Sequence, residues 1–398
     1  MFLRIIQLIT WGIILGYVFF RPFISEPPFW KLDMALNGLL LVSFAGYSLS
    51  KHIKIKLIDK ALLIFFLSLL LSTLNSNNIL VNLSQIYKYL SLTAVFYIAR
   101  LCNKNERKQI LYVLLLSAIL ISLYSLHYLF FGSQFTLEYL SENSANCIFA
   151  KEFLASKRAF VPFFSPNLLA GYLIAIIMIC LNITVRGKKE KEGLFFLSAF
   201  CLPVSALTLF FTKSTGGGLV FIIIFSLFLL LGKLLNKKNG LIIFSLIILF
   251  GAIAVNRELK EASFKKPLFS LNKKISYWKE TVKIIEQHPL TGVGVGNFSL
   301  KETRAAHNSY LQIWAEMGIL GLLSWLVIVF IFIKEGVKNL YSKSNYYNLG
   351  ILMSGLSFLL YNLIDFSFFV SQSAFLFWIV LGFIVNNENQ APNRLSER

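Results

Sequence analysis

The chain alternates between long apolar runs and short polar breaks. Each run approaches the roughly 20 residues that an α-helix needs to cross a bilayer. In hydrocarbon only helices and closed barrels satisfy their own backbone, so the pattern predicts an all-α polytopic membrane protein that forms one integral unit over residues 1–398. Twelve transmembrane helices are expected, near residues 5–20, 34–50, 61–75, 82–101, 110–131, 167–185, 194–212, 217–235, 241–256, 309–333, 347–365 and 370–386.

Composition supports the membrane assignment. Of the 398 residues, 57% are hydrophobic and 14% are charged, whereas roughly a quarter of residues are charged in soluble proteins. The net charge of +19 does not indicate nucleic acid as a partner, because much of it lies in short loops between apolar runs. The cysteines lack the spacing of a zinc site or a disulfide framework, so free thiols are expected. They are Cys102, Cys147, Cys180 and Cys201.

Alternate loops carry most of the Lys and Arg residues, and this fixes the expected orientation. With twelve spans, the basic loops all fall on one side, which the positive-inside rule makes cytoplasmic together with both termini. These loops lie near residues 51–60, 100–108, 186–191, 233–238 and 334–343. The other face, expected to be periplasmic, receives a loop near 132–166, a tight turn at 213–218 and a large loop at 257–308.

The large periplasmic loop carries ten Lys or Arg residues against five Glu. Such an excess on this face is consistent with an anionic ligand. Within the loop, apolar residues recur at helical spacing and are flanked by Lys279 and Lys283. They are Ile275, Trp278, Val282 and Ile285. This pattern predicts an amphipathic helix that either lies on the outer leaflet or caps the helix bundle.

The polar residues from His307 onward stand where this loop enters an apolar span. Asn308 and Tyr310 follow at once, and Glu316 lies one or two turns into the span. A histidine at a helix start is often only a hydrogen-bonded polar residue, but histidine can also exchange a proton near neutral pH. Glu316 is either functional or paired with a cation of a neighbouring helix. Gly292, Gly294 and Gly296 lack the spacing of a nucleotide loop and predict a turn.

Two other segments are expected on the same face. Arg158 precedes Pro166 and Asn167, and its guanidinium could bind a diphosphate through two hydrogen bonds. Lys213 lies in the turn TKSTGGG, whose small residues permit close approach of a ligand or, alternatively, tight packing of a helical hairpin.

Three segments resemble the O-antigen ligase and polymerase superfamily of bacterial membrane glycosyltransferases. RAFVPFFSPNLLAGYL resembles the arginine and PN motif of the family, and LTLFFTKSTGGG resembles its L-T-x-S-R-G turn. The third segment has two parts. The first resembles the R-x-x-x-W helix and the HP and glycine motif of the family, and reads KKISYWKETVKIIEQHPLTGVGVGNF. The second resembles its HN motif and reads HNSYLQIWAEMGILGLL. The similarity covers roughly residues 158 to 323; the N-terminal half resembles the family only as a set of spans.

The resemblance implies a GT-C-like membrane fold and assigns roles to individual residues. His307 takes the place of the histidine that activates or positions the acceptor hydroxyl. Lys274, four residues before Trp278, stands where the family has a diphosphate-binding arginine, and Thr215 stands where the turn usually has another. Lysine lacks the two-point fork of arginine, and threonine lacks charge. Arg158 and Lys213 are therefore the candidates to complete the donor site.

The expected function is a metal-independent glycosyltransferase of the bacterial inner membrane that needs no cofactor. Its donor would be a glycan on undecaprenyl diphosphate, and its acceptor most simply lipid A-core, as for an O-antigen ligase. A polysaccharide polymerase and a protein O-oligosaccharyltransferase remain alternatives within this class. Outside it, a transport or lipid-binding protein would also explain the spans and the basic loop, but not the three matching segments.

Overall fold

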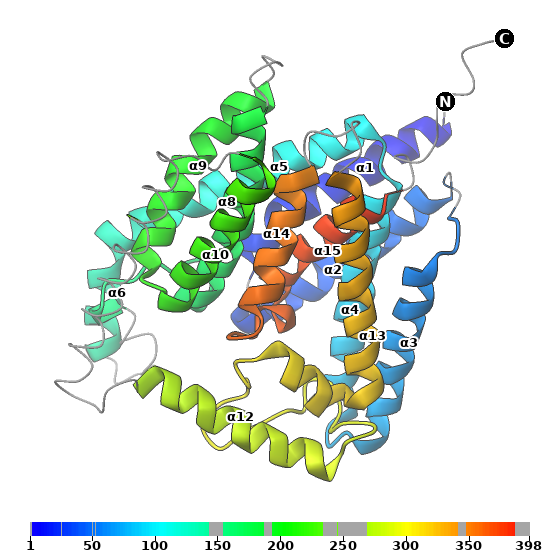
Figure 1. The fold of residues 1–398 in the computed structure, drawn as a ribbon, viewed down its shortest axis with the longest axis vertical. Coiled ribbons are helices and arrows are strands. Elements are labelled where there is room, and N and C mark those ends of the chain that lie inside the picture. Colours follow the sequence, from blue (N-terminus) through cyan, green and yellow to red (C-terminus); the bar gives the residue numbers. More distant parts are fainter. Residues whose placement is uncertain are drawn as a thin grey trace.

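The computed structural model describes residues 2–24, 26–49, 51, 53–142, 154–186, 193–233, 245, 269–340 and 348–386. Every regular element within these ranges is helical, as the sequence predicts (Figure 1). The α-helices are α1 (Phe2–Phe20), α2 (Glu26–Ser48), α3 (Leu57–Leu71), α4 (Ile79–Leu101), α5 (Lys104–His127), α6 (Ser133–Glu142), α8 (Pro166–Arg186), α9 (Gly193–Thr212), α10 (Thr215–Leu231), α12 (Phe269–Gln287), α13 (Ser309–Leu340), α14 (Asn348–Tyr361) and α15 (Ser371–Val385).

Helices stand at eleven of the twelve positions where the sequence predicts spans. The remaining span, 241–256, lies outside the described residues apart from Ser245. In the described part of the chain, five helical segments are long and apolar enough to cross a membrane. They are Leu57–Asn75, Lys104–Thr136, Pro166–Val185, Gly193–Thr212 and Ser309–Leu340. These segments support a multi-pass membrane protein, whereas the count of twelve stays a prediction.

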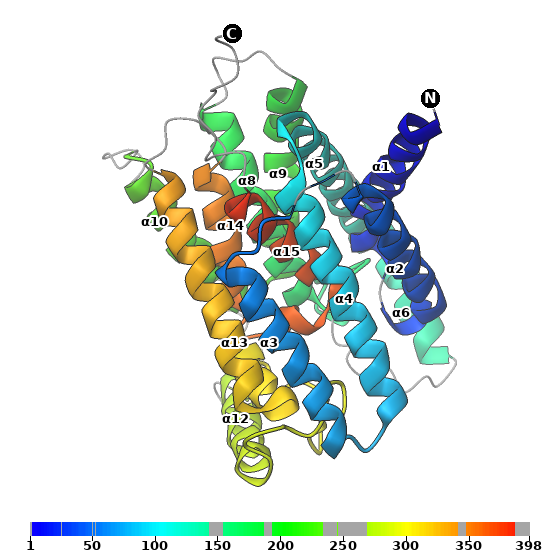
Figure 2. The ribbon, with the colours of Figure 1, turned by 90° about the vertical axis from the view of Figure 1, so that its right-hand side faces the viewer.

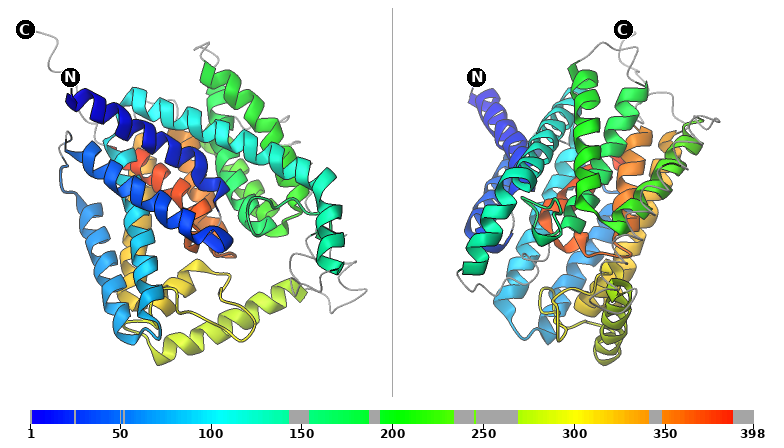
Figure 3. Two further views of the ribbon diagram at one scale, coloured as in Figure 1. Left: turned by 180° about the vertical axis from the view of Figure 1, so that it is seen from behind. Right: turned by 90° about the vertical axis from the view of Figure 1, so that its left-hand side faces the viewer.

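α15 is the centre of the bundle. Every residue of this helix is buried, and it packs against α4, α8, α13 and α14. α8, α9, α10 and α14 gather on one side of it, and α3, α4 and α13 on the other (Figures 1 and 3). A helix that is apolar all round must be buried, and α15 fits this description.

Two of the predicted basic loops meet at one end of the bundle, which we call the cationic end. The Lys51 Nζ lies 3.3 Å from a carboxylate oxygen of Glu106, and Arg100 donates a 2.6 Å hydrogen bond to the carbonyl of Lys54. Loops 51–60 and 100–108 therefore share one side, as expected. α12 lies across the opposite end, which we call the site end (Figures 1 and 2).

The loop that follows α12 is fitted into a break in α13. Gly318 has a φ of +69°, so α13 is interrupted there rather than continuous as the apolar run suggests. Ile319 donates its N–H to the carbonyl of Pro289 at 3.0 Å, and Val293 donates to the carbonyl of Ala315 at 2.9 Å. The break thus exposes backbone groups that the loop satisfies, which hydrocarbon requires. Gly292, Gly294 and Gly296 also have positive φ, as their predicted turn needs.

Replacing Gly318 by alanine is expected to destabilise the protein by about 2 kcal/mol or more, because a side chain in the left-handed region is strained. A Cβ at this position would also overlap the carbonyl oxygen of Leu290. Gly12→Ala is the matched control, because no atom lies within 4 Å of its added Cβ. Thermal unfolding of the purified protein in detergent measures both. Equal melting temperatures for the two variants would contradict the role assigned to the break.

Candidate active site

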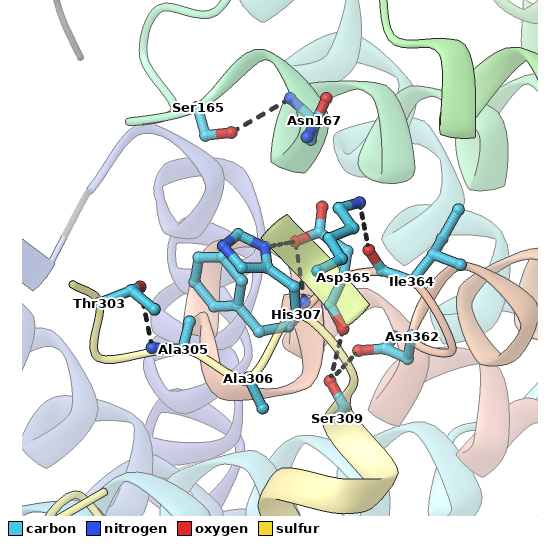
Figure 4. Close-up of polar contacts among 12 residues, drawn as sticks. Ser165, Asn167, Thr303, Ala305, Ala306, His307, Ser309, Asn362, Ile364 and Asp365 are labelled. Atoms are coloured by element: carbon cyan, nitrogen blue, oxygen red, sulfur yellow. Dashed lines mark hydrogen bonds and ion pairs between the residues drawn. The ribbon is translucent and has the colours of Figure 1, made fainter. Parts of the chain in front are cut away.

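His307 lies at the site end, in the segment between α12 and α13 (Figure 4). Its backbone is left-handed, with a φ of +52°, and its carbonyl accepts a 3.4 Å hydrogen bond from the indole Nε1 of Trp278. On its N-terminal side, Ala306 donates its N–H to Gln312 at 3.1 Å. Contacts from α12 and α13 therefore fix the main chain that carries the imidazole.

Two aromatic rings hold the imidazole of His307. Tyr277 stacks on it with ring centroids 5.8 Å apart and an interplanar angle of 23°. Phe366 meets it edge-on, with centroids 5.2 Å apart at 84°. The side chain is nevertheless 25% exposed. The ring is thus oriented by its neighbours and still accessible to a ligand.

Asp365 is the closest charged partner of His307. Its Oδ1 lies 3.7 Å from the Nδ1 of His307, and its side chain is 2% exposed. This distance is too long for a hydrogen bond but lies within the range of an ion pair. Because Nδ1 faces the carboxylate, the Nε2 atom points away from it (Figure 4). The pair therefore presents one ring nitrogen to incoming groups, as in histidine dyads that accept protons.

The end of α14 holds Asp365 opposite His307. Ser309, the first residue of α13, donates its N–H to the carbonyl of Asn362 at 2.8 Å and its hydroxyl to Asn362 Oδ1 at 2.6 Å. The same hydroxyl lies 3.2 Å from the carbonyl of Asp365. Sequence reasoning did not select Asp365. A carboxylate flanked by two apolar runs was the available signal, since such residues are rare near membranes without a function.

Lys274 is the predicted donor-site cation that reaches this pair. It lies near the start of α12, and its ammonium donates a 2.7 Å hydrogen bond to the carbonyl of Ile364, the neighbour of Asp365 (Figure 4). The ammonium of Lys274 is therefore bound to the residue that precedes Asp365.

Arg158 approaches the same segment from the other side. Its side chain is largely buried, donating from Nε to the carbonyl of Thr212 at 2.9 Å and from a terminal nitrogen to Asn167 Oδ1 at 3.2 Å. Asn167 also accepts from Ser214 at 3.0 Å, and the Ser214 hydroxyl lies 3.2 Å from that of Tyr361. Three separate segments thus form one polar network that ends four residues before Asp365.

Lys213 is oriented differently from the other two cations. It has a φ of +50°, and its ammonium donates a 2.8 Å hydrogen bond to the carbonyl of Ser156. The next residue, Ser214, caps α10 by accepting the N–H of Gly217 at 3.2 Å. Lys213 therefore fastens the turn to the segment before Arg158. Thr215 is simply the first residue of α10.

The remaining predicted site residues stabilise the surroundings of His307. The side chain of Asn308 accepts the N–H groups of Tyr310 and Leu311 at 3.0 and 3.1 Å, which caps the start of α13. The hydroxyl of Tyr310 donates to the carbonyl of Leu359 at 3.2 Å. Glu316 is buried and accepts the N–H of Gly296 and the amide of Gln312, both at 2.8 Å.

α12 packs on the bundle through a face that differs from the predicted stripe. Tyr277, Thr281 and Ile285 are buried. Ile275 and Val282 are 37% and 41% exposed, on the side where the exposed Lys279 and Lys283 also lie. Tyr277 donates to Glu302 at 3.2 Å, and burial raises the pKa of its hydroxyl. The predicted stripe is thus divided: Ile285 packs on the protein, while Ile275 and Val282 remain outside.

No group of three His, Cys, Asp or Glu side chains is placed to hold a metal ion in the described ranges.

The comparison with known families concerns the centre of this site. Residues 199–326 match the family model described as O-antigen ligase. The matched stretch contains Lys213, Lys274, His307 and Glu316, whereas Arg158 and Asp365 lie outside it. No match was found among curated proteins. Over residues 199–326, the chain is therefore similar to the O-antigen ligase family, which supports the resemblance to the O-antigen ligase and polymerase superfamily.

Proposed function

We propose that the protein transfers a glycan from undecaprenyl diphosphate to an acceptor hydroxyl at the periplasmic face of the bacterial inner membrane. The acceptor proposed first is lipid A-core, which makes the protein an O-antigen ligase. The family match supports a lipid-linked glycan and an acceptor as its partners. The observation that carries the proposal is the exposed imidazole of His307 backed by the buried carboxylate of Asp365.

The geometry suggests how the pair acts. The Nε2 atom of His307 takes the proton of the acceptor hydroxyl while the oxygen attacks the anomeric carbon of the donor sugar. The bond from that carbon to the diphosphate oxygen breaks, and its electron pair leaves with the lipid diphosphate. Asp365 stabilises the imidazolium and holds the ring with Nδ1 inward. His307 is thus the proposed base, and Asp365 the residue that positions it.

The leaving diphosphate gains negative charge as the bond breaks, and preorganised cations stabilise that charge. Lys274 is the first candidate because its ammonium binds the carbonyl of Ile364, the residue before Asp365. Arg158 contributes from the other side of residues 361–365, through the Asn167 and Ser214 network. In this proposal these cations act without a metal ion or a cofactor.

The proposed orientation rests on charge. Loops 51–60 and 100–108 meet at the cationic end, and the positive-inside rule favours the cytoplasm for that end. The site end then faces the periplasm, with both termini in the cytoplasm. The exposed Ile275 and Val282 of α12, with Lys279 and Lys283 nearby, suit a helix that contacts the outer leaflet of the membrane.

His307→Ala is expected to reduce transfer by about a hundredfold to ten-thousandfold, the usual contribution of general base catalysis. His307→Gln should be nearly as inactive if the imidazole accepts a proton. Asp365→Asn should also slow transfer in the wild-type background but have little further effect in the His307→Ala background, because Asp365 acts through the imidazole. The rate of transfer by purified protein, supplied with lipid-linked donor and acceptor, measures all four variants.

Thermal unfolding serves as the control for these variants, since Asn at position 365 can still accept the N–H of Phe366. A His307→Gln variant with most of the wild-type activity would mean that His307 only orients the acceptor. Wild-type activity in His307→Ala would remove His307 from the mechanism, whereas an absence of transfer by the purified wild-type protein would favour the transport or lipid-binding alternative. Additive losses in the double variant would show that Asp365 acts independently of His307.

Lys274→Ala is expected to impair transfer more than Lys279→Ala, by roughly tenfold or more, because a charge-assisted hydrogen bond contributes about 1.5–3 kcal/mol. The two lysines lie on the same helix, but Lys274 contacts the segment of Asp365 whereas Lys279 is exposed. Initial transfer rates at several salt concentrations provide the comparison. If both variants lose activity equally and high salt removes the difference from wild type, α12 acts only as a diffuse field of charge.

Deletion of the protein in its native host separates the acceptor alternatives. A ligase is expected to leave long glycan chains that are made but not attached to lipid A-core, and gel analysis of lipopolysaccharide shows this directly. Lipopolysaccharide capped with single repeat units would instead identify a polymerase. Normal lipopolysaccharide with loss of glycan from proteins would point to a protein O-oligosaccharyltransferase.

A further inference from the structure

A cavity of about 220 Å³ opens at the cationic end, far from His307, between the start of α3 and the last turns of α13. Its walls include Lys56, Leu57, Phe330, Lys334 and Glu335. The volume equals that of roughly seven water molecules at their share of the liquid, about 30 Å³ each. This space can hold a small polar headgroup at the edge of the apolar bundle.

The cavity has an excess of positive charge. Asp59, the carboxylate nearest to Lys56 along the chain, is bound by Arg100 at 2.5 Å. Glu335 lies 3.9 Å from Lys338. Within the described residues, neither Lys56 nor Lys334 forms an ion pair; the ammonium of Lys56 donates a 3.4 Å hydrogen bond to the carbonyl of Val385, and its backbone N–H donates to Asp59 at 2.6 Å. The ion pairs of Asp59 and Glu335 are therefore with Arg100 and Lys338, and not with the two lysines that line the cavity.

Lys56 is held where a positive charge is unfavourable. Burial lowers its pKa, and the charges of Arg100 and Lys338 lower it further, against the opposite effect of Glu335 and Asp59. A bound anion would relieve both costs, because it would replace lost hydration and oppose the neighbouring cations.

The cavity also has apolar lining residues, and the apolar surface that they form continues along the outside of the bundle. Leu57 and Phe330 line it and are 59% and 60% exposed. Ile64, two helical turns from Leu57, and Val327, one turn from Phe330, are also exposed. Residues three or seven positions apart share a helix face, so apolar surface follows both helices away from the lysines toward the middle of the membrane.

We propose that this cavity binds an anionic phospholipid. Its phosphate would lie between Lys56 and Lys334, and an acyl chain would follow the exposed apolar faces of α3 and α13. Basic pockets between transmembrane helices bind such headgroups in other membrane proteins. The apolar continuation favours a lipid over free phosphate, because only a lipid uses both halves of the cavity. This inference does not depend on the proposed transferase activity.

The test uses the full-length protein in a neutral detergent, with short-chain phosphatidylglycerol as the probe and thermal unfolding as the readout. Phosphatidylglycerol is expected to raise the melting temperature of the wild type saturably, and phosphatidylcholine to do so much less. Lys56→Gln with Lys334→Gln should weaken the apparent affinity for phosphatidylglycerol by about 25-fold, since each lysine near a membrane surface contributes about fivefold. Lys334→Gln alone should weaken it about fivefold, which keeps the test usable if the double variant does not fold.

The matched control is Lys60→Gln with Lys104→Gln, which removes the same charge from exposed positions at the same end. This variant should bind phosphatidylglycerol almost as the wild type does. An equal loss in the control would overturn the proposal in favour of general surface charge. Equal stabilisation by phosphatidylcholine, or by inorganic phosphate alone, would also overturn it, in the second case because the site would then recognise phosphate without a lipid.

Discussion

The junction between Ser309 and Asn362 determines the geometry of the candidate site. It joins the first residue of α13 to the end of α14 through one backbone and one side-chain hydrogen bond, all of it buried. His307 precedes α13 and Asp365 follows α14, so this junction is what brings the two residues together. Two satisfied polar pairs in an apolar environment are costly to separate, because their groups have no water to replace the lost partner. The junction therefore fixes the contact between His307 and Asp365, although these residues are far apart in the sequence.

Charged residues of the described chain gather at two ends of the molecule, the cationic end and the site end. At the cationic end, lysines and arginines surround partly buried carboxylates such as Asp59, and the excess of positive charge is large. At the site end, Arg158, Lys213 and Lys274 are held by hydrogen bonds to backbone carbonyls. A charge that only orients a protein can be mobile, whereas one that stabilises a leaving group must be fixed before the reaction.

The sequence predicted well what depends on local pattern. The helices follow from the apolar runs, and the glycine turn follows from residues that tolerate positive φ. The pairing of Asp365 with His307 was not predictable, because it depends on a contact between residues 58 positions apart. The break at Gly318 was missed for a related reason: the apolar run hides it, and only the backbone of residues 289–293 makes it stable. The buried face of α12 was misjudged because Tyr277 and Thr281, both polar, occupy it.

α12 is attached to the site at three levels, through Lys274, Tyr277 and Trp278. Because a helix moves as a stiff rod over such a short length, any shift of its depth or tilt displaces all three contacts of the site together. The exposed Ile275 and Val282 are on the same rod. Contact of these two residues with the outer leaflet, as proposed above, would couple the thickness and packing of the surrounding lipid to the position of the imidazole.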